Sequence, residues 1–183
     1  MELIDKDKRD GYIYDVVIKQ YDTQFWKTTT GTPAVASNKL RFTSAAAASY
    51  ILHRYGDFEF AVNVPTTPSA GEAKHWGLRA PATDSIGAIY FEIVGAVFQA
   101  VTIDDGGTSE TTTLTWAAGY TAVETKFRII WEPDIVRFMI NGVIVATHVT
   151  RVPSNSLPLR IVNSDADNVD VGYVQIRQAA AIV

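Results

Sequence analysis

Short segments in which apolar and polar residues alternate run through this chain, and this pattern constrains its fold most. In residues 57–64, Phe58, Phe60 and Val62 fall on one side of an extended chain, and Asp57 falls on the other. Successive side chains of a β-strand point to opposite faces, so this pattern predicts a strand with one face on a core. Similar segments, separated by turn-forming residues, lie at 11–21, 39–43, 57–64, 88–94, 96–103, 111–116, 125–132, 135–140, 143–149, 158–163 and 171–177. Their spacing is typical of an all-β sandwich.

The turns between these segments favour antiparallel pairing. Asn141 and Gly142 stand between two apolar, alternating segments. A type I′ hairpin turn needs positive φ at both central residues, which Asn and Gly adopt most easily, so we predict a hairpin here. Residues 44–52 contain four alanines without a helix-capping pattern, and we predict a loop or a single helical turn for them.

Length and charge limit the organisation of the chain and its partners. A chain of 183 residues suits one domain, and we expect it to span residues 21–178, with residues 1–20 as an arm or added strand and 179–183 as a tail. The formal net charge of -4 argues against nucleic acid or an anionic membrane as partner, because both require a basic face. The first ten residues contain no apolar run, so we expect no signal peptide, and a location in a virion or in the cytoplasm before release.

Four pieces of the sequence resemble the concanavalin A-like jelly-roll superfamily, the two-sheet sandwich of legume lectins, laminin-G-like modules and laminarinase-type glycoside hydrolases. They are FRIIWEPDIVRFMINGVIV at 127–145, LPLRIVN at 157–163, VGYVQIRQ at 171–178 and RYGDFEFAVNVP at 54–65. In that family the first piece forms two strands that end in a hairpin, and the next two close the sheet. The resemblance, which covers residues 25–178, implies an all-β, two-sheet antiparallel jelly-roll sandwich.

The same resemblance argues against an enzyme. Laminarinase-type hydrolases carry Glu-x-Asp-x-x-Glu on one strand, because alternate side chains must reach the cleft together as nucleophile and acid. Here residues 89–94 offer Glu92 alone, and Val94 stands where the family places Asp. We therefore predict that the chain is not an enzyme, and we rank a divergent glycoside hydrolase with Glu92 as one carboxylate lowest.

A group of carboxylates suggests a metal site. Asp165, Asp167 and Asp170 lie close together in the sequence, and clustered carboxylates suit calcium, the one cofactor that we consider. We favour a solvated acidic loop instead, because the spacing is not that of an EF-hand. In addition, the concanavalin A-like family often has Asp where this chain has Gly172, and this difference argues against the calcium site of that family.

Aromatic residues suggest glycan contacts, because an aromatic ring suits the apolar face of a sugar. The candidates are Trp76, Arg79, Trp116 and Tyr120. For Trp76 we favour a place in the core, and for Trp116 the core or an interface. The three histidines show no metal-binding or general-base spacing, and we interpret each as a satisfied polar residue: His53, His75 and His148.

Three functions compete. We expect first a non-enzymatic structural or docking protein, a capsid decoration or tail-associated component of a virion such as a phage. It would contact other protein subunits and form a homo-oligomer through residues 1–20 and 179–183. The absence of an export signal, of Cys and of a catalytic carboxylate set supports this hypothesis. The alternative is a carbohydrate-binding module with a glycan as partner, and the divergent glycoside hydrolase comes last.

Overall fold

A computed structural model of the chain describes residues 12–18, 26–64, 67, 70–71, 73–80, 86–121 and 123–179. Within these ranges the regular structure is antiparallel β-strand, apart from a 3₁₀ turn at Ala118–Thr121. The strands are β1 (Tyr12–Ile18), β2 (Trp26–Thr30), β3 (Ala34–Ala36), β4 (Lys39–His53), β5 (Gly56–Asn63), β6 (Ala73–Arg79), β7 (Ala88–Val94), β8 (Val97–Ile103), β9 (Ser109–Leu114), β10 (Thr125–Glu132), β11 (Ile135–Ile140), β12 (Val143–His148) and β13 (Leu157–Ala179). No helix in the described ranges is long and apolar enough to cross a membrane.

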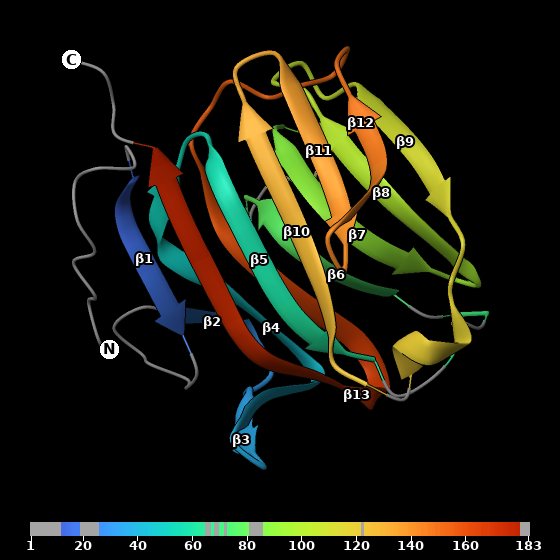
Figure 1. Cartoon of the computed structure of the whole chain (residues 1–183). Helices are drawn as coiled ribbons and strands as arrows, with labels where there is room; N and C mark the ends of the chain where they lie inside the picture. The colour runs from blue at the N-terminus through green and yellow to red at the C-terminus, as the bar shows by residue number, and fades with distance from the viewer. Residues whose placement is uncertain are drawn as a thin grey trace.

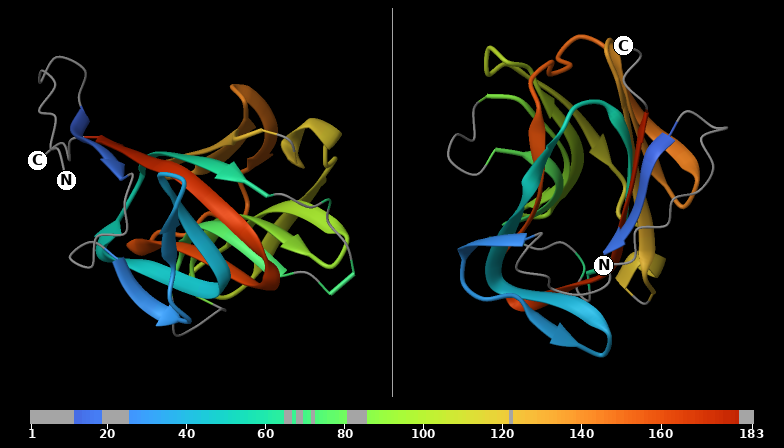
Figure 2. Two further views of the ribbon diagram at one scale, coloured as in Figure 1. Left: turned by 90° about the horizontal axis from the view of Figure 1, so that it is seen from below. Right: turned by 90° about the vertical axis from the view of Figure 1, so that its left-hand side faces the viewer.

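The strands form two layers that face each other, and the long strand β13 belongs to both (Figures 1 and 2). Residues 159–163 of β13 pair with β6, which continues into β7, β8 and β9 as the first layer. Residues 170–177 of β13 pair with β5, which continues into β10, β11 and β12 as the second layer. Strand β4 likewise follows β13 through both layers. The predicted two-sheet antiparallel jelly-roll sandwich is confirmed.

Aromatic rings from both layers fill the space between them. Trp76 of β6 meets Phe127 of β10 with ring centroids 4.8 Å apart, and Phe91 of β7 meets Phe138 of β11 at 5.1 Å. All four rings are almost completely buried. Burial of a large apolar side chain contributes about 1.5–3 kcal/mol, so these contacts hold the layers together.

Two predicted loops are wrong, whereas the predicted hairpin is confirmed. Asn141 and Gly142 turn between β11 and β12 with φ of 48° and 83°. Residues 44–52 belong to β4, and the acidic residues 164–170 belong to β13. Ala has weak β-propensity, but Ala46, Ala47 and Ala48 of β4 pair with β2 on one side and with β13 on the other, and this pairing overrides the local preference. In β13 the acidic residues 164–167 lie where the register with β4 shifts, between Asn163 and Asn168.

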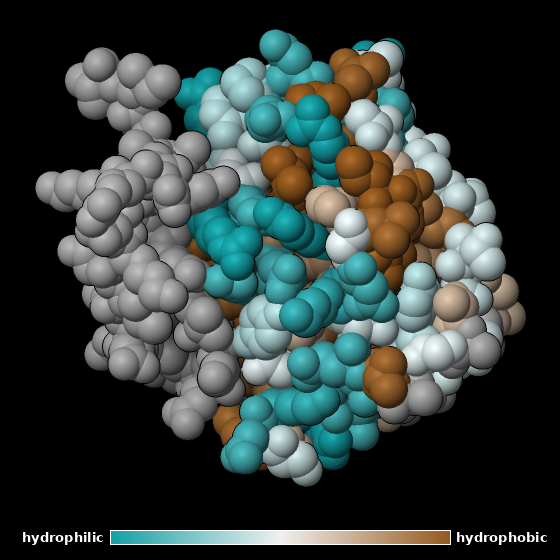
Figure 3. Space-filling model, viewed as in Figure 1, coloured by the Kyte–Doolittle hydropathy of each residue, from teal (hydrophilic) through white to brown (hydrophobic). Residues whose placement is uncertain are grey.

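The outer face of the second layer is polar over β5, β10 and β13 and apolar over β11 and β12 (Figure 3). On the apolar part, Val143 is 65% exposed. On the polar part, Asp57 of β5 accepts a hydrogen bond from Arg128 Nε at 2.7 Å and lies 3.5 Å from Arg177 Nη1. This ion-pair cluster connects three neighbouring strands of the layer.

Candidate functional site

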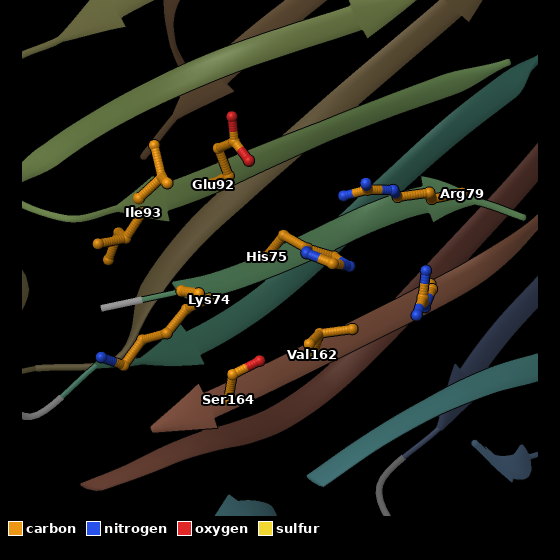
Figure 4. Close-up of a pocket in the computed structure, with 10 residues that line it drawn as sticks. Lys74, His75, Arg79, Glu92, Ile93, Val162 and Ser164 are labelled. Carbon is orange, nitrogen blue, oxygen red and sulfur yellow. The ribbon is translucent and has the colours of Figure 1, made fainter. Parts of the chain in front are cut away.

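A hollow of about 270 Å³ lies over β6, β7 and β13 (Figure 4). Trp76 and Phe91 point into the core, so His75 and Glu92, each one position away, point to the outer face of the first layer. The hollow is lined by residues of these three strands: Ala73, Lys74, His75, Arg79, Glu92, Ile93, Val94, Arg160, Val162 and Ser164.

The strand register places the polar side chains of the hollow beside one another. His75 of β6 is the cross-strand neighbour of Glu92 on β7 and of Val162 on β13. Glu92 in turn lies opposite Gln99 on β8. Directly opposite residues have Cβ atoms about 4.5–5.5 Å apart, so these four side chains form one row across the sheet.

Gln99 holds the carboxylate of Glu92. The side-chain amide of Gln99 donates a hydrogen bond to Glu92 Oε1. Both residues are half-buried, so the carboxylate stays in contact with the hollow while one of its oxygens is held in place. Such a hydrogen bond to a charged group is stronger than one between neutral groups.

His75 is an uncharged imidazole at neutral pH. Burial lowers the pKa of His75 well below its ordinary value of 6.5, and the positive charges of Arg79 and Arg160 lower it further. Its Nε2 atom is buried and has no hydrogen-bond partner among the described residues. A neutral imidazole donates through one nitrogen and accepts through the other, so His75 can bind a hydroxyl group of a ligand.

Gly77 allows β6 and β7 to approach closely beside the hollow. It is the cross-strand neighbour of Arg160 on β13 and of Tyr90 on β7. A Cβ atom on Gly77 would lie 2.3 Å from the Ile89 carbonyl oxygen and 2.6 Å from Tyr90 Cα, so only glycine fits. Arg79 places its guanidinium over the ring of Tyr90, 4.8 Å from its centroid. Arg160 Nη1 donates to the Ala80 carbonyl at 3.4 Å.

The structure does not bring the four predicted glycan contacts together. Arg79 lines the hollow. Trp76 is fully buried in the core, so it has no free face for a sugar. Trp116 and Tyr120 pack edge to face at 5.3 Å, half-buried beside the core, and neither lines the hollow.

The predicted calcium ligands contact cationic side chains. Asp165 Oδ2 lies 2.9 Å from Lys74 Nζ, and Asp167 Oδ1 lies 3.3 Å from the same atom. Asp170 accepts two hydrogen bonds from Arg41, at 2.7 and 2.8 Å. In the part of the chain that the structure describes, no three acidic or histidine side chains gather in a way that could hold a metal ion. All three carboxylates therefore have cationic partners within the chain.

Sequence reasoning missed most of the hollow. His75 was interpreted as a satisfied polar residue, and Gln99 and Arg160 received no role. Each lies one position from a buried residue in an alternating strand, which predicts an outward-facing side chain. The pairing of β13 with β6, which places Arg160 near His75, has no local signal in the sequence.

Comparison with known proteins supports the fold. No family model matches the chain, and no curated protein matches it by sequence. Solved structures do match: a Bacillus licheniformis β-glucanase at a TM-score of 0.72 and 13% identity, over 88% of this chain and 97% of that one. The Crh5 transglycosylase matches with a TM-score of 0.72 and 17% sequence identity, over 90% of this chain and 84% of that one. The laminarinase catalytic domain of Thermotoga maritima matches with a TM-score of 0.71 and 12% sequence identity, over 92% of this chain and 99% of that one.

These structures correct the functional prediction. We predicted a non-enzymatic virion component, yet the structures that share the fold over most of both chains are a glucanase, a laminarinase and a transglycosylase. The first hypothesis, with its assignment as a non-enzyme, is therefore wrong. The two layers, the antiparallel order and these matches agree with the resemblance in the sequence: the chain has the concanavalin A-like jelly-roll fold of the glucanases and laminarinases.

Proposed function

We propose that the chain is a carbohydrate-active enzyme of the glycoside hydrolase type, which binds a glycan in the hollow and uses Glu92 as its catalytic carboxylate. One observation carries the proposal: Glu92 lies beside His75 in a surface hollow of a fold that glucanases share. Because a fold by itself does not determine a function, the proposal rests on these side chains.

The groups in the hollow suit a sugar. The ionised carboxylate of Glu92, which Gln99 keeps oriented, can take a proton from the water molecule that attacks the anomeric carbon. The sugar oxygen that leaves takes its proton from solvent. Neutral His75 adds an uncharged polar ring beside Glu92 in the lining of the hollow. Val94 and Val162 add apolar surface for the C–H face of the ring. Among the described residues that line the hollow Glu92 is the one carboxylate, so the proposal assigns it a single role and does not assume the pair of a laminarinase.

A comparison of two glutamate variants tests the proposal. Release of reducing ends is measured on lichenan, laminarin and acidic polysaccharides for the wild type, Glu92→Gln and Glu132→Gln. Glu132 is the matched control, because it is an exposed carboxylate on β10 that pairs with Arg137 outside the hollow. We expect Glu92→Gln to lower kcat at least about 100-fold while glycan binding persists, and Glu132→Gln to behave as wild type. Turnover that survives Glu92→Gln, or glycan binding without any turnover, would contradict the catalytic role.

A further inference from the structure

Lys74 places a charged group inside the protein. Its side chain is fully buried, and Figure 4 shows it extending away from His75. Trp76, two positions along β6, packs in the core, so Lys74 lies on the core side of the same strand. Its cross-strand neighbour on β7 is Ile93, which is also buried. The amine of Lys74 is therefore held out of solvent at the end of the apolar core.

Two carboxylates of β13 lie within reach of this amine. Asp165 Oδ2 is 2.9 Å from Lys74 Nζ, and Asp167 Oδ1 is 3.3 Å from the same nitrogen. The backbone N–H of Ala73 donates a hydrogen bond to Asp165 Oδ2 at 3.1 Å. Amide formation needs a nucleophile, a carboxyl group that it can attack, a group that moves protons and a donor that stabilises the developing oxyanion. The two strands bring all four together here.

Asn163 holds the backbone of both aspartates in place. It stands opposite Lys74 in the register of β13 with β6, and it is 1% exposed. Its side-chain nitrogen donates to the Asp167 carbonyl at 2.6 Å, and its side-chain oxygen accepts from the Asp165 N–H at 3.1 Å. The hydroxyl of Ser44 donates to the Asp165 carbonyl at 2.9 Å. Groups that are held next to each other react much faster than free ones, so this frame favours a reaction between Lys74 and Asp165.

We propose that Lys74 and Asp165 join in an amide cross-link between their side chains, with Asp167 as the residue that transfers the protons. This modification is independent of the proposed function, because it uses neither Glu92 nor a glycan. It would connect β6 to β13 close to the point where β13 passes from the first layer to the second.

The reaction releases one water molecule and needs no further reactant. A proton passes from the ammonium of Lys74 to Asp165, which leaves a free amine and a neutral carboxyl group. The amine nitrogen attacks Asp165 Cγ, Oδ2 takes the negative charge beside the Ala73 N–H, and Asp167 accepts a proton from the nitrogen. Asp167 then gives this proton to the other oxygen of Asp165, which leaves as water. A C–N bond replaces a C–O bond, and no group is oxidised or reduced.

The loss of two charges favours the product. A buried ion pair carries the desolvation cost of both ions, and the Lys74 side chain is completely removed from solvent. The amide has no net charge, so this cost disappears when the bond forms. A cross-link between positions 74 and 165 also restricts the unfolded chain, as a disulfide over a long loop does.

Mass spectrometry of the denatured full chain tests the proposal. We expect the wild type to be lighter than its sequence by the mass of one water molecule. Trypsin does not cleave after an acylated lysine, so a tryptic digest should contain a branched peptide in which residues 55–79 are joined to residues 161–177. Fragmentation of this peptide should place the bond at Lys74 and Asp165.

Two variants and a control assign the roles. Lys74→Met removes the nucleophile and should have the full mass. Asp167→Asn keeps the size of the side chain but cannot transfer the protons, and we expect it to form the bond at least about 100-fold more slowly. Lys39→Met is the matched control, because Lys39 lies 3.0 Å from Glu124 but is 30% exposed, and it should keep the mass deficit of the wild type. Far-UV circular dichroism checks the fold of each variant.

The opposite results would overturn the cross-link. A folded wild type that keeps its full mass after prolonged incubation at neutral pH would show that Lys74 and Asp165 remain an ion pair. A mass deficit that persists in Lys74→Met, or that maps to another peptide such as the one with Asp105 and Gly106, would place the loss of water elsewhere. If Lys74→Met does not fold, the presence or absence of the branched peptide in the wild type decides the question by itself.

Discussion

His148 of β12 and Thr102 of β8 are joined by a hydrogen bond of 2.9 Å between His148 Nδ1 and Thr102 Oγ1, across the interior of the sandwich. The second ring nitrogen, Nε2, lies 2.9 Å from Thr112 Oγ1 on β9. His148 is fully buried, so one imidazole connects the last strand of the second layer to two strands of the first. Burial lowers the pKa of His148, and the charge of Glu110 opposes this shift only in part.

This contact predicts that the protein loses stability in mild acid. The folded-state pKa values of His148 and His75 lie below the ordinary value of 6.5, so below about pH 6.5 the unfolded chain binds protons that the folded chain does not. Their contribution to the free energy of unfolding is complete above that pH and is lost as the pH falls. We expect urea midpoints to decrease between pH 7.5 and 5.5, with a slope of up to about 1.4 kcal/mol per pH unit for each histidine.

The variant His148→Gln isolates the contribution of His148 to the pH dependence of stability. Glutamine cannot take up a proton, so the variant should show a smaller pH slope than wild type, although its stability at pH 7.5 is lower. His75→Gln should reduce the slope independently, since the two imidazoles lie in different places. A wild-type midpoint that stays constant over this range would contradict the prediction.

The hydrogen bond from Gln99 to Glu92 predicts an effect on catalysis with little effect on folding. Gln99→Met keeps the length of the side chain and removes its donor. Because a hydrogen bond to a charged group contributes about 1.5–3 kcal/mol, we expect kcat to decrease by about 10- to 100-fold. The melting temperature should change little, because Gln99 is half-exposed. Steady-state kinetics and a thermal melt separate the two effects, and full activity in Gln99→Met would show that Glu92 needs no such support.

The close contact at Gly77 predicts a strong effect of a single methyl group. In Gly77→Ala the new Cβ would overlap backbone atoms of Ile89 and Tyr90, which cannot move without breaking the β6–β7 ladder. We expect the free energy of unfolding to decrease by about 3 kcal/mol. Gly119→Ala is the control, because no atom lies within 4 Å of a Cβ at that position. Urea denaturation of both variants measures the difference, and equal stabilities would refute the contact.

The ion pairs of Asp57 predict a second stability difference. Asp57 is 5% exposed and contacts Arg128 and Arg177, so Asp57→Asn leaves two guanidinium groups without their shared carboxylate. We expect a loss of about 2 kcal/mol in the free energy of unfolding. Glu132→Gln breaks the exposed pair with Arg137 and should cost less than about 1 kcal/mol. A loss for Asp57→Asn no larger than that for Glu132→Gln would contradict the role of burial.

Local patterns in the sequence were sufficient to predict the strands in which apolar and polar residues alternate and which end at a recognisable turn. The β7, β10 and β11 segments were predicted with the bounds that the structure has, and the Asn141–Gly142 hairpin followed from φ preferences alone. The resemblance to the concanavalin A-like jelly roll added the pairing into two sheets. These features depend on neighbours along the chain, where the period of two and the turn chemistry are visible.

The sequence by itself determined the strands with clear alternation and their buried faces, because side-chain alternation is a local property, whereas β2, β3 and β6 were not predicted. Only the tertiary structure decided the continuous strand β13, the extent of β4 and the composition of the hollow. His75, Glu92 and Arg160 meet because β13 pairs with β6 and β6 with β7, and this register is set by the packing of the whole sandwich. The same packing directs Asp165 to Lys74, which no pattern near those residues predicts, whereas the burial of Trp76 agrees with its predicted place in the core.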